Sequence, residues 1–175
     1  MKKIYILIIS VVLLVGCSKS INNSDSVKKE NKKGESTMQF IVPKQNNGQT
    51  SDIIEYGKKL VKEHPEIGEE GEISIYYVGA TYKVNEIDHA VFMFVNKTKE
   101  NLKKDLELKI SWSYDDQVIY DNQIIDFKIA DQMELPDNSA TFLLTPITSS
   151  QKEIVDKMTE ESKMKLEIID IQVKG

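Results

Sequence analysis

The chain has few of the residues on which catalytic and cross-linked sites depend. Its 175 residues include one cysteine, two histidines and no arginine, so all 23 basic residues are lysines. A single cysteine excludes a disulfide within the chain, and the folded part must therefore be stable on its core alone. Arginine is the residue best suited to clamping phosphate with paired hydrogen bonds, so its absence argues against a phosphate-handling site.

The two histidines, His64 and His89, are not placed for metal binding or catalysis, because neither has a second ligand at zinc spacing. The sequence contains no Gly-x-Ser-x-Gly motif, no glycine-rich phosphate loop and no histidine placed to activate a serine. The acidic stretches 69–72 and 115–116 lack the spacing of a calcium loop and are typical of solvated turns. We therefore expect no metal, no cofactor and no enzymatic activity.

The start of the chain has the pattern of an export signal. Lys2 and Lys3 precede the apolar run Ile4–Val15, which has the length of a signal-peptide core and is too short to cross a bilayer. The run ends in a motif around the only cysteine, which consists of Leu14, Val15, Gly16 and Cys17. This motif resembles the lipobox of bacterial lipoproteins.

The lipobox resemblance implies a location for the protein. Residues 1–16 would be a signal peptide, cut before Cys17, and lipid on the Cys17 sulfur would hold the protein at the outer face of the bacterial cytoplasmic membrane. Two acyl chains give stable attachment, whereas one holds weakly. The alternatives are an uncleaved apolar anchor helix and an ordinary secretory signal that leaves a free thiol.

Residues 17–50 are predicted to be the lipidated cysteine and a disordered polar tether, because they are rich in Ser, Asn, Lys and Gln. Residues 18–50 hold six lysines against three acids, a net charge of +3. Residues 51–175 hold fifteen lysines against twenty-five acids, a net charge of −10. An acidic domain argues against nucleic acid as a partner.

An amphipathic helix and an acidic turn are expected over residues 51–72. The spacing Asp52-x-x-Glu55 is typical of a capping box, and Pro65 ends the helix. The predicted apolar stripe consists of Ile53, Tyr56, Leu60, Val61 and His64.

After residue 72 the apolar pattern has the period of a β-strand. The clearest strand is Asp105–Tyr114, whose alternation places Trp112 in the core, and Ala90–Val95 is apolar on both faces and should be central. Val118–Ile129 changes parity near Asn122, which indicates a bulge. The remaining expected elements are strands Ile73–Val84, Ala140–Ile147 and Met164–Val173, a parity change at Ile168-Ile169, and a short helix capped by Ser150 and Glu153.

These elements predict a mainly β fold, an immunoglobulin-like antiparallel β-sandwich over residues 73–175 that is preceded by a short helix. A small open barrel is the alternative. Aromatic residues at strand spacing belong more often to a core than to a ligand site. Tyr76 and Tyr77 are adjacent and must point to opposite faces, so we expect one ring to be exposed as a contact residue.

Four segments carry a second resemblance: Ile73-Ser74-Ile75, Val91–Asn96, Val118–Asp126 and Leu135-Pro136-Asp137-Asn138-Ser139-Ala140. They resemble the SLAP domain of Gram-positive bacteria, which is named for a protein of accessory secretion and surface-layer assembly. The similarity covers residues 73–170, and such segments also occur in other immunoglobulin-like lipoprotein domains. The family's surface role would suit a tethered module, and the lipid anchor of this chain is a departure from the family.

The sequence thus predicts a membrane-anchored extracytoplasmic lipoprotein that displays a non-catalytic β-sandwich for contacts with a protein or the cell envelope. An exposed strand edge could recruit the partner. The alternative is a solute- or ion-binding lipoprotein in which the acidic loops or the tyrosines line a pocket.

Overall fold

The structure is a computed structural model, which describes residues 37–44 and 51–174. The predicted signal peptide, the lipobox with Cys17 and most of the predicted tether lie outside the described residues. In the part of the chain that is described, no helix is long and apolar enough to cross a membrane.

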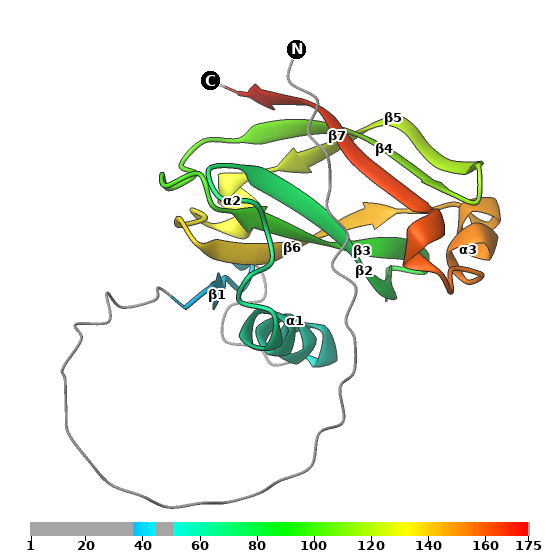
Figure 1. Cartoon of the computed structure of the whole chain (residues 1–175), viewed down its shortest axis with the longest axis horizontal. Coiled ribbons are helices and arrows are strands. Elements are labelled where there is room, and N and C mark those ends of the chain that lie inside the picture. The colour runs from blue at the N-terminus through cyan, green and yellow to red at the C-terminus, as the bar shows by residue number, and fades with distance from the viewer. Residues whose placement is uncertain (1–36, 45–50, 175) are drawn as a thin grey trace, which may run out of the picture. The chain divides into compact units, whose positions relative to one another are not determined.

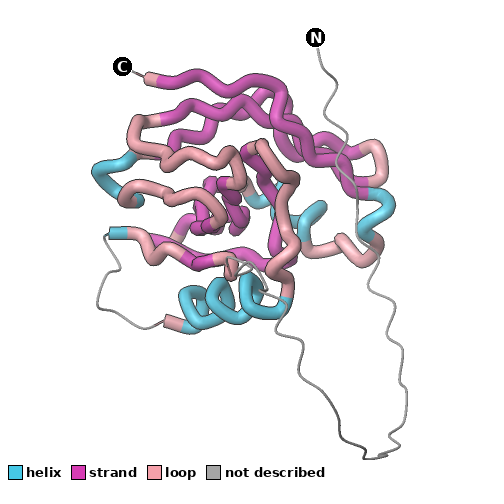
Figure 2. Tube along the Cα trace, turned by 60° about the vertical axis from the view of Figure 1, so that its left-hand side comes forward, coloured by secondary structure: helices cyan, strands magenta, loops and turns pink. Residues whose placement is uncertain are grey.

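Residues 37–44 and 51–174 form one helical layer and two layers of β-sheet (Figure 1). The strands are β1 (Gln39–Phe40), β2 (Ile73–Val84), β3 (Ile87–Asn96), β4 (Leu106–Tyr114), β5 (Gln117–Phe127), β6 (Ser139–Pro146) and β7 (Met164–Val173). The helices are α1 (Asp52–Glu63), α2 (Ile129–Gln132), α3 (Ser149–Val155) and a 3₁₀ turn at Glu161–Lys163. The sheets pack face to face and α1 lies against the outer face of one of them (Figure 2). The predicted mainly β sandwich preceded by a short helix is confirmed.

The strand order has an immunoglobulin-like pattern. The four-stranded sheet has the order β1-β6-β3-β2 and the three-stranded sheet the order β5-β4-β7. In immunoglobulin terms, β2-β3-β6 correspond to strands A-B-E and β5-β4-β7 to strands C′-C-F. The place of strand G, beside β7, holds no strand among the described residues. All pairs are antiparallel except β1 with β6, which is parallel.

The main core lies between the two sheets and is built on aromatic side chains. Trp112 of β4 is fully buried, and its ring centroid lies 5.2 Å from that of Phe92 and 4.8 Å from that of Tyr77. Phe94 and Phe127 pair across the same core at 5.1 Å. Each such pair contributes about 0.5–1.5 kcal/mol beyond the area it buries. The predicted alternation of β4 and the core position of Trp112 are confirmed.

A second core lies between the four-stranded sheet and α1, and it explains why β3 is apolar at consecutive positions. Phe92 and Phe94 face the other sheet, whereas Val91, Met93 and Val95 face the helical layer. Both faces of β3 are therefore buried, as a central strand requires. The prediction of a central strand is confirmed.

Bulges account for the parity changes of β5 and β7, and β5 carries a second one at Ile119, between the pairs Trp112↔Tyr120 and Ser113↔Val118. Between the pairs Ile110↔Gln123 and Trp112↔Tyr120, β5 carries one residue more than β4, and Asn122 has a φ of 54°. In β7, Ile169 has no partner between the pairs Ile110↔Ile168 and Lys109↔Asp170. Both predicted irregularities are confirmed.

The strand β1 corrects the predicted tether. Gln39 and Phe40 pair with Ser139 and Ala140 of β6, and Met38 is buried. Residues 37–44, which the sequence pattern assigns to a disordered segment, therefore include an ordered strand. Their burial depends on α1 and on β6, and β6 lies far along the chain.

The predicted helix starts are also corrected. Ser51 is the N-cap residue of α1 and makes no side-chain cap bond, so the predicted Asp52/Glu55 capping box is wrong. The capping box of α3 is formed by Thr148 and Gln151, not by Ser150 and Glu153.

Of the predicted apolar stripe of α1, Val61 is buried, and Ile53 and Leu60 pack against the second core. The fully buried face of the helix nevertheless differs from the stripe. It consists of Ile54, Gly57 and Val61, whereas Tyr56 lies at the exposed margin. The helix is therefore turned so that its glycine faces the sheet.

Candidate functional site

The outward face of the three-stranded sheet is left without a described covering element. Because α1 packs on the four-stranded sheet, no described helix lies over this face (Figure 1). We define the open face as the outward residues of β4 and their register partners on β5 and β7. These are Glu107, Lys109, Ser111, Ser113, Val118, Ile124, Asp126, Lys165, Glu167, Asp170 and Gln172.

The open face combines small hydroxyls with charges and two apolar side chains. Ser111 and Ser113 lie along its centre on β4, and Val118 and Ile124 on β5 are 60% and 39% exposed. Charged side chains around them pair locally, as in the 2.8 Å contact between Lys174 Nζ and Glu107 Oε2. Exposed pairs of this kind stabilise a fold by only about 0–1 kcal/mol, so these charges remain available to a partner.

The edge of β7 is the second feature of this surface. The side chains of Ile171 and Val173 face the core side of the sheet, because they pair in register with the buried Leu108 and Leu106. Ile171 is nevertheless 36% exposed and Val173 61%. With no described strand on its outer side, β7 presents unpaired backbone groups beside apolar side chains, which is a typical site for strand addition.

The structure places the predicted contact residues Tyr76 and Tyr77 on opposite faces of β2, but both are half-buried. Tyr77 packs against Trp112 in the main core, and burial raises its pKa from 10.0 to about 12. Tyr76 packs in the second core, and burial also raises its pKa. The expectation that one of the two rings is exposed is wrong. The more exposed tyrosines are Tyr56 and Tyr82.

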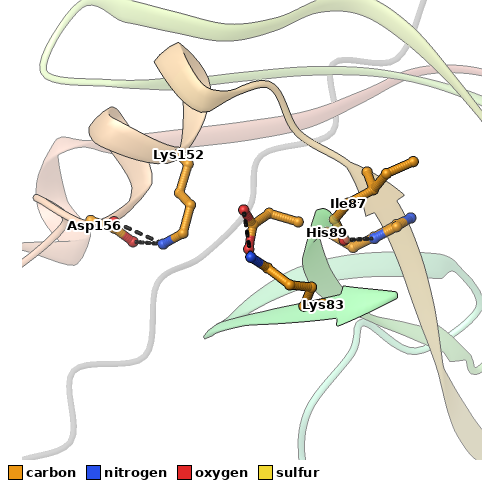
Figure 3. A network of polar contacts seen from close by, with 6 residues as sticks. Lys83, Ile87, His89, Lys152 and Asp156 are labelled. Carbon is orange, nitrogen blue, oxygen red and sulfur yellow. Dashed lines mark hydrogen bonds and ion pairs between the residues drawn. The ribbon is translucent and has the colours of Figure 1, made fainter. Parts of the chain in front are cut away.

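A polar cluster lies where the β2–β3 hairpin meets α3, and Figure 3 shows it in close view. Lys83 Nζ lies 4.0 Å from Asp88 Oδ2, and Lys152 Nζ donates to Asp156 Oδ1 at 2.7 Å. The hydrogen bond to Asp156, together with the charge of Asp88, raises the pKa of Lys152. His89 Nδ1 lies 2.9 Å from the Ile87 carbonyl oxygen, so this nitrogen carries the proton. The two lysines of the cluster pair with its two aspartates, as is typical of a contact that holds two parts of a fold together.

The acidic turn between α1 and β2 holds a cation supplied by the chain itself. The Lys97 side chain is 7% exposed, and its Nζ donates to the Glu66 carbonyl at 3.1 Å and lies 3.5 Å from Glu70 Oε1. An ion bound in this turn would compete with the ammonium for the same oxygens. Among the described residues, no three His, Cys, Asp or Glu side chains are grouped to hold a metal ion.

Asn96 has a role that the sequence pattern did not reveal. It is fully buried, and its amide nitrogen lies 2.8, 2.9 and 3.0 Å from the carbonyl oxygens of Glu100, Leu135 and Pro136. Its Oδ1 accepts from Thr98 N at 3.1 Å. An asparagine at the end of an otherwise apolar strand was the available signal. Asn96 thus joins two of the segments that carry the SLAP resemblance.

A solvent-open depression runs along the outer face of α1, lined by Glu55, Lys58, Lys59, Lys62 and Glu63. Two ion pairs within the helix, Lys58 with Glu55 and Lys59 with Glu63, occupy it. Four of its five lining side chains are therefore engaged in ion pairs within the helix.

In comparisons with known protein families, curated proteins and solved structures, nothing matches the chain. The resemblances to the lipobox and to the SLAP domain therefore stay predictions from the sequence.

Proposed function

We propose that this protein is a lipid-anchored extracytoplasmic lipoprotein whose β-sandwich binds a protein or cell-envelope partner without catalysis. The lipobox supports an anchor at Cys17 on the outer face of the bacterial cytoplasmic membrane, and the SLAP resemblance supports a surface role. The observation that carries the contact function is the open face with the neighbouring edge of β7. One face of a sheet is bare while every other sheet face is covered within the described residues.

The position of the anchored end supports this assignment. The described domain begins at Thr37, directly before β1, and β1 lies beside β6 and contacts the α1 side of the four-stranded sheet. The open face belongs to the other sheet. The first described residue therefore belongs to the layer opposite the open face.

The edge of β7 supports strand pairing as the mode of contact. An added strand would occupy the position of strand G. It would also cover the side chains of Ile171 and Val173, which are partly exposed without it. Strand addition gains affinity from backbone hydrogen bonds and specificity from alternate side chains. An extended partner segment with apolar residues at alternate positions fits this edge.

Site-specific photo-crosslinking in intact cells tests the proposal. A photoreactive amino acid replaces Lys109 on the open face, and the matched control replaces Lys59 on the outer face of α1. We expect a crosslinked envelope component at position 109 that is absent at position 59. The same pattern of products from both positions would contradict the assignment of the open face.

A second pair of variants separates the edge from the face. Val173→Lys adds a charge where an incoming strand would pack, and Lys174→Gln changes a neighbouring charge without blocking the edge. We expect the crosslink at position 109 to be lost with Val173→Lys and kept with Lys174→Gln. An unchanged crosslink with Val173→Lys would confine the contact to side chains of the open face.

A further inference from the structure

The edge of β6 that does not pair with β3 pairs with the very short strand β1. Gln39 N donates to the Asn138 carbonyl at 3.2 Å and Ile41 N donates to the Ala140 carbonyl at 2.7 Å. Only two residues of β1 have strand partners, whereas β2, β3 and β6 pair over long registers. The backbone bonds of β1 are therefore few, and its side chains must supply most of the attachment.

Two side chains hold β1 in a groove between β6 and α1. Met38 is 4% exposed, and the Phe40 ring packs edge-on against Phe142 of β6 with centroids 4.9 Å apart. The Phe40 ring also rests directly on Gly57 of α1, where an added Cβ would overlap it and lie 2.9 Å from Phe142 Cε2. The glycine, which is unfavourable inside a helix, thus makes room for this aromatic ring.

We propose that this groove also accepts residues 37–43 of a second copy, so that two copies exchange β1. The segment seated in the groove is itself the fitting ligand, because its backbone and its Met38 and Phe40 side chains match the site. β1 is the first element of the described domain, and the six residues that join Lys44 to Ser51 are polar or glycine in sequence. Exchange of a terminal element is a low-cost route to a dimer.

The balance between the closed and exchanged forms follows from their identical contacts. Each groove holds the same Met38, Phe40 and backbone bonds in both forms, so the difference lies in the connecting residues and in the entropy of association. Concentration therefore decides the balance. An anchored protein is concentrated at a surface, so exchange would link neighbouring copies if the proposed lipid anchor is correct. The exchange itself does not require the anchor.

Single-cysteine variants of the full chain test the exchange. In a Cys17→Ala background, one preparation carries Gln39→Cys and another Ser139→Cys, at positions that are direct partners in the β1–β6 register. After mixing and mild oxidation, a disulfide-linked heterodimer reports β1 of one copy in the groove of the other. The matched control mixes Gln39→Cys with Ser113→Cys on the open face.

We expect heterodimer well above the control, with a dimer-to-monomer ratio that rises about tenfold for a tenfold increase in concentration before saturation. The double variant Gln39→Cys/Ser139→Cys should form the disulfide within one chain at low concentration, which shows that the pair can react. Heterodimer no more abundant than the Ser113→Cys control at any concentration would overturn the proposal.

A second measurement avoids the cysteines at the strand. Native mass spectrometry of the full Cys17→Ala chain in detergent should show a dimer that grows with concentration. Gly57→Ala should abolish this dimer while circular dichroism shows the β-sheet signal retained, because the added methyl displaces Phe40. A chain that is monomeric at all concentrations, or a dimer unaffected by Gly57→Ala, would also overturn the proposal.

Discussion

The substitution Asn96→Asp should lower the free energy of unfolding by an amount that increases with pH. The Asn96 amide nitrogen is surrounded by three carbonyl oxygens at 2.8–3.0 Å and is fully buried. A carboxylate at this position cannot donate to any of them, and it meets three partial negative charges in their place. Oδ1 would still accept from Thr98 N, so only the donor side is lost.

The magnitude follows from two contributions. An amide nitrogen has two hydrogens and a protonated carboxyl has one, so the protonated acid loses one buried bond, which costs about 1–1.5 kcal/mol. Burial near the carbonyl oxygens raises the pKa of the new acid, so folding at about pH 7 requires its protonation or the burial of its charge. With an unfolded pKa near 3.9, protonation at about pH 7 costs at most about 4 kcal/mol.

Urea unfolding of the wild type and of Asn96→Asp at about pH 4 and about pH 7 measures the loss in the free energy of unfolding. We expect a loss in the free energy of unfolding of about 1–2 kcal/mol at the lower pH and about 4–5 kcal/mol at the higher pH. The sign follows from linkage. The folded pKa of the acid is raised, so stability is retained below its unfolded pKa and falls as the pH rises through its folded pKa.

Asn101→Asp is the matched control for this prediction. Asn101 is exposed, and its side-chain oxygen only accepts, from Asp137 N at 3.2 Å. An aspartate can keep that bond, so the control should change stability by less than about 1 kcal/mol at either pH. Equal losses for Asn96→Asp at both pH values, or a loss no larger than that of the control, would refute the reasoning.

Two further predictions concern buried polar groups. Burial raises the pKa of Tyr77 from 10.0 to about 12, so its contribution to stability is fully present below pH 10 and is lost as the pH rises to about 12. The wild type should lose stability as the pH rises from about 9 to 12, and urea unfolding over that range measures the loss. Because the Tyr77 side chain is partly exposed, we expect Tyr77→Phe to reduce this loss by only about 1–2 kcal/mol. Tyr82→Phe, at an exposed ring, should leave the alkaline loss unchanged. Lys97→Met keeps the aliphatic stem but leaves the Glu66 carbonyl without its donor, so it should lower the unfolding free energy by about 1–3 kcal/mol. Glu70→Gln, at the exposed end of the ion pair, should cost less than about 1 kcal/mol, and equal effects of Lys97→Met and Glu70→Gln would contradict this account.

Strands with a regular apolar period were predictable from the sequence. The bounds of β2 and β7 agree with the expected strands Ile73–Val84 and Met164–Val173, and the irregularities near Asn122 and Ile169 were visible as changes of parity. A period of two indicates a strand locally, because alternate side chains face a core whichever strand lies beside it.

Features that depend on a distant partner were not predictable in this way. β1 has two paired residues, and nothing near Phe40 in the sequence indicates that Gly57 leaves space for its ring. The burial of Tyr77 depends on Trp112, and the role of Asn96 depends on carbonyl groups 39 and 40 residues away. The open face was expected only as an unspecified exposed edge, because sequence periodicity does not state which sheet face α1 covers.

The central claim is that the sandwich is displayed on a membrane by lipid at Cys17. Mass spectrometry of the native protein from bacterial membranes tests it most directly. We expect a mature chain that begins at Cys17 and carries the added mass of acyl groups on that residue, and a Cys17→Ala variant without this mass. A mature protein with an unmodified Cys17 thiol, or one that begins at another residue, would contradict the account.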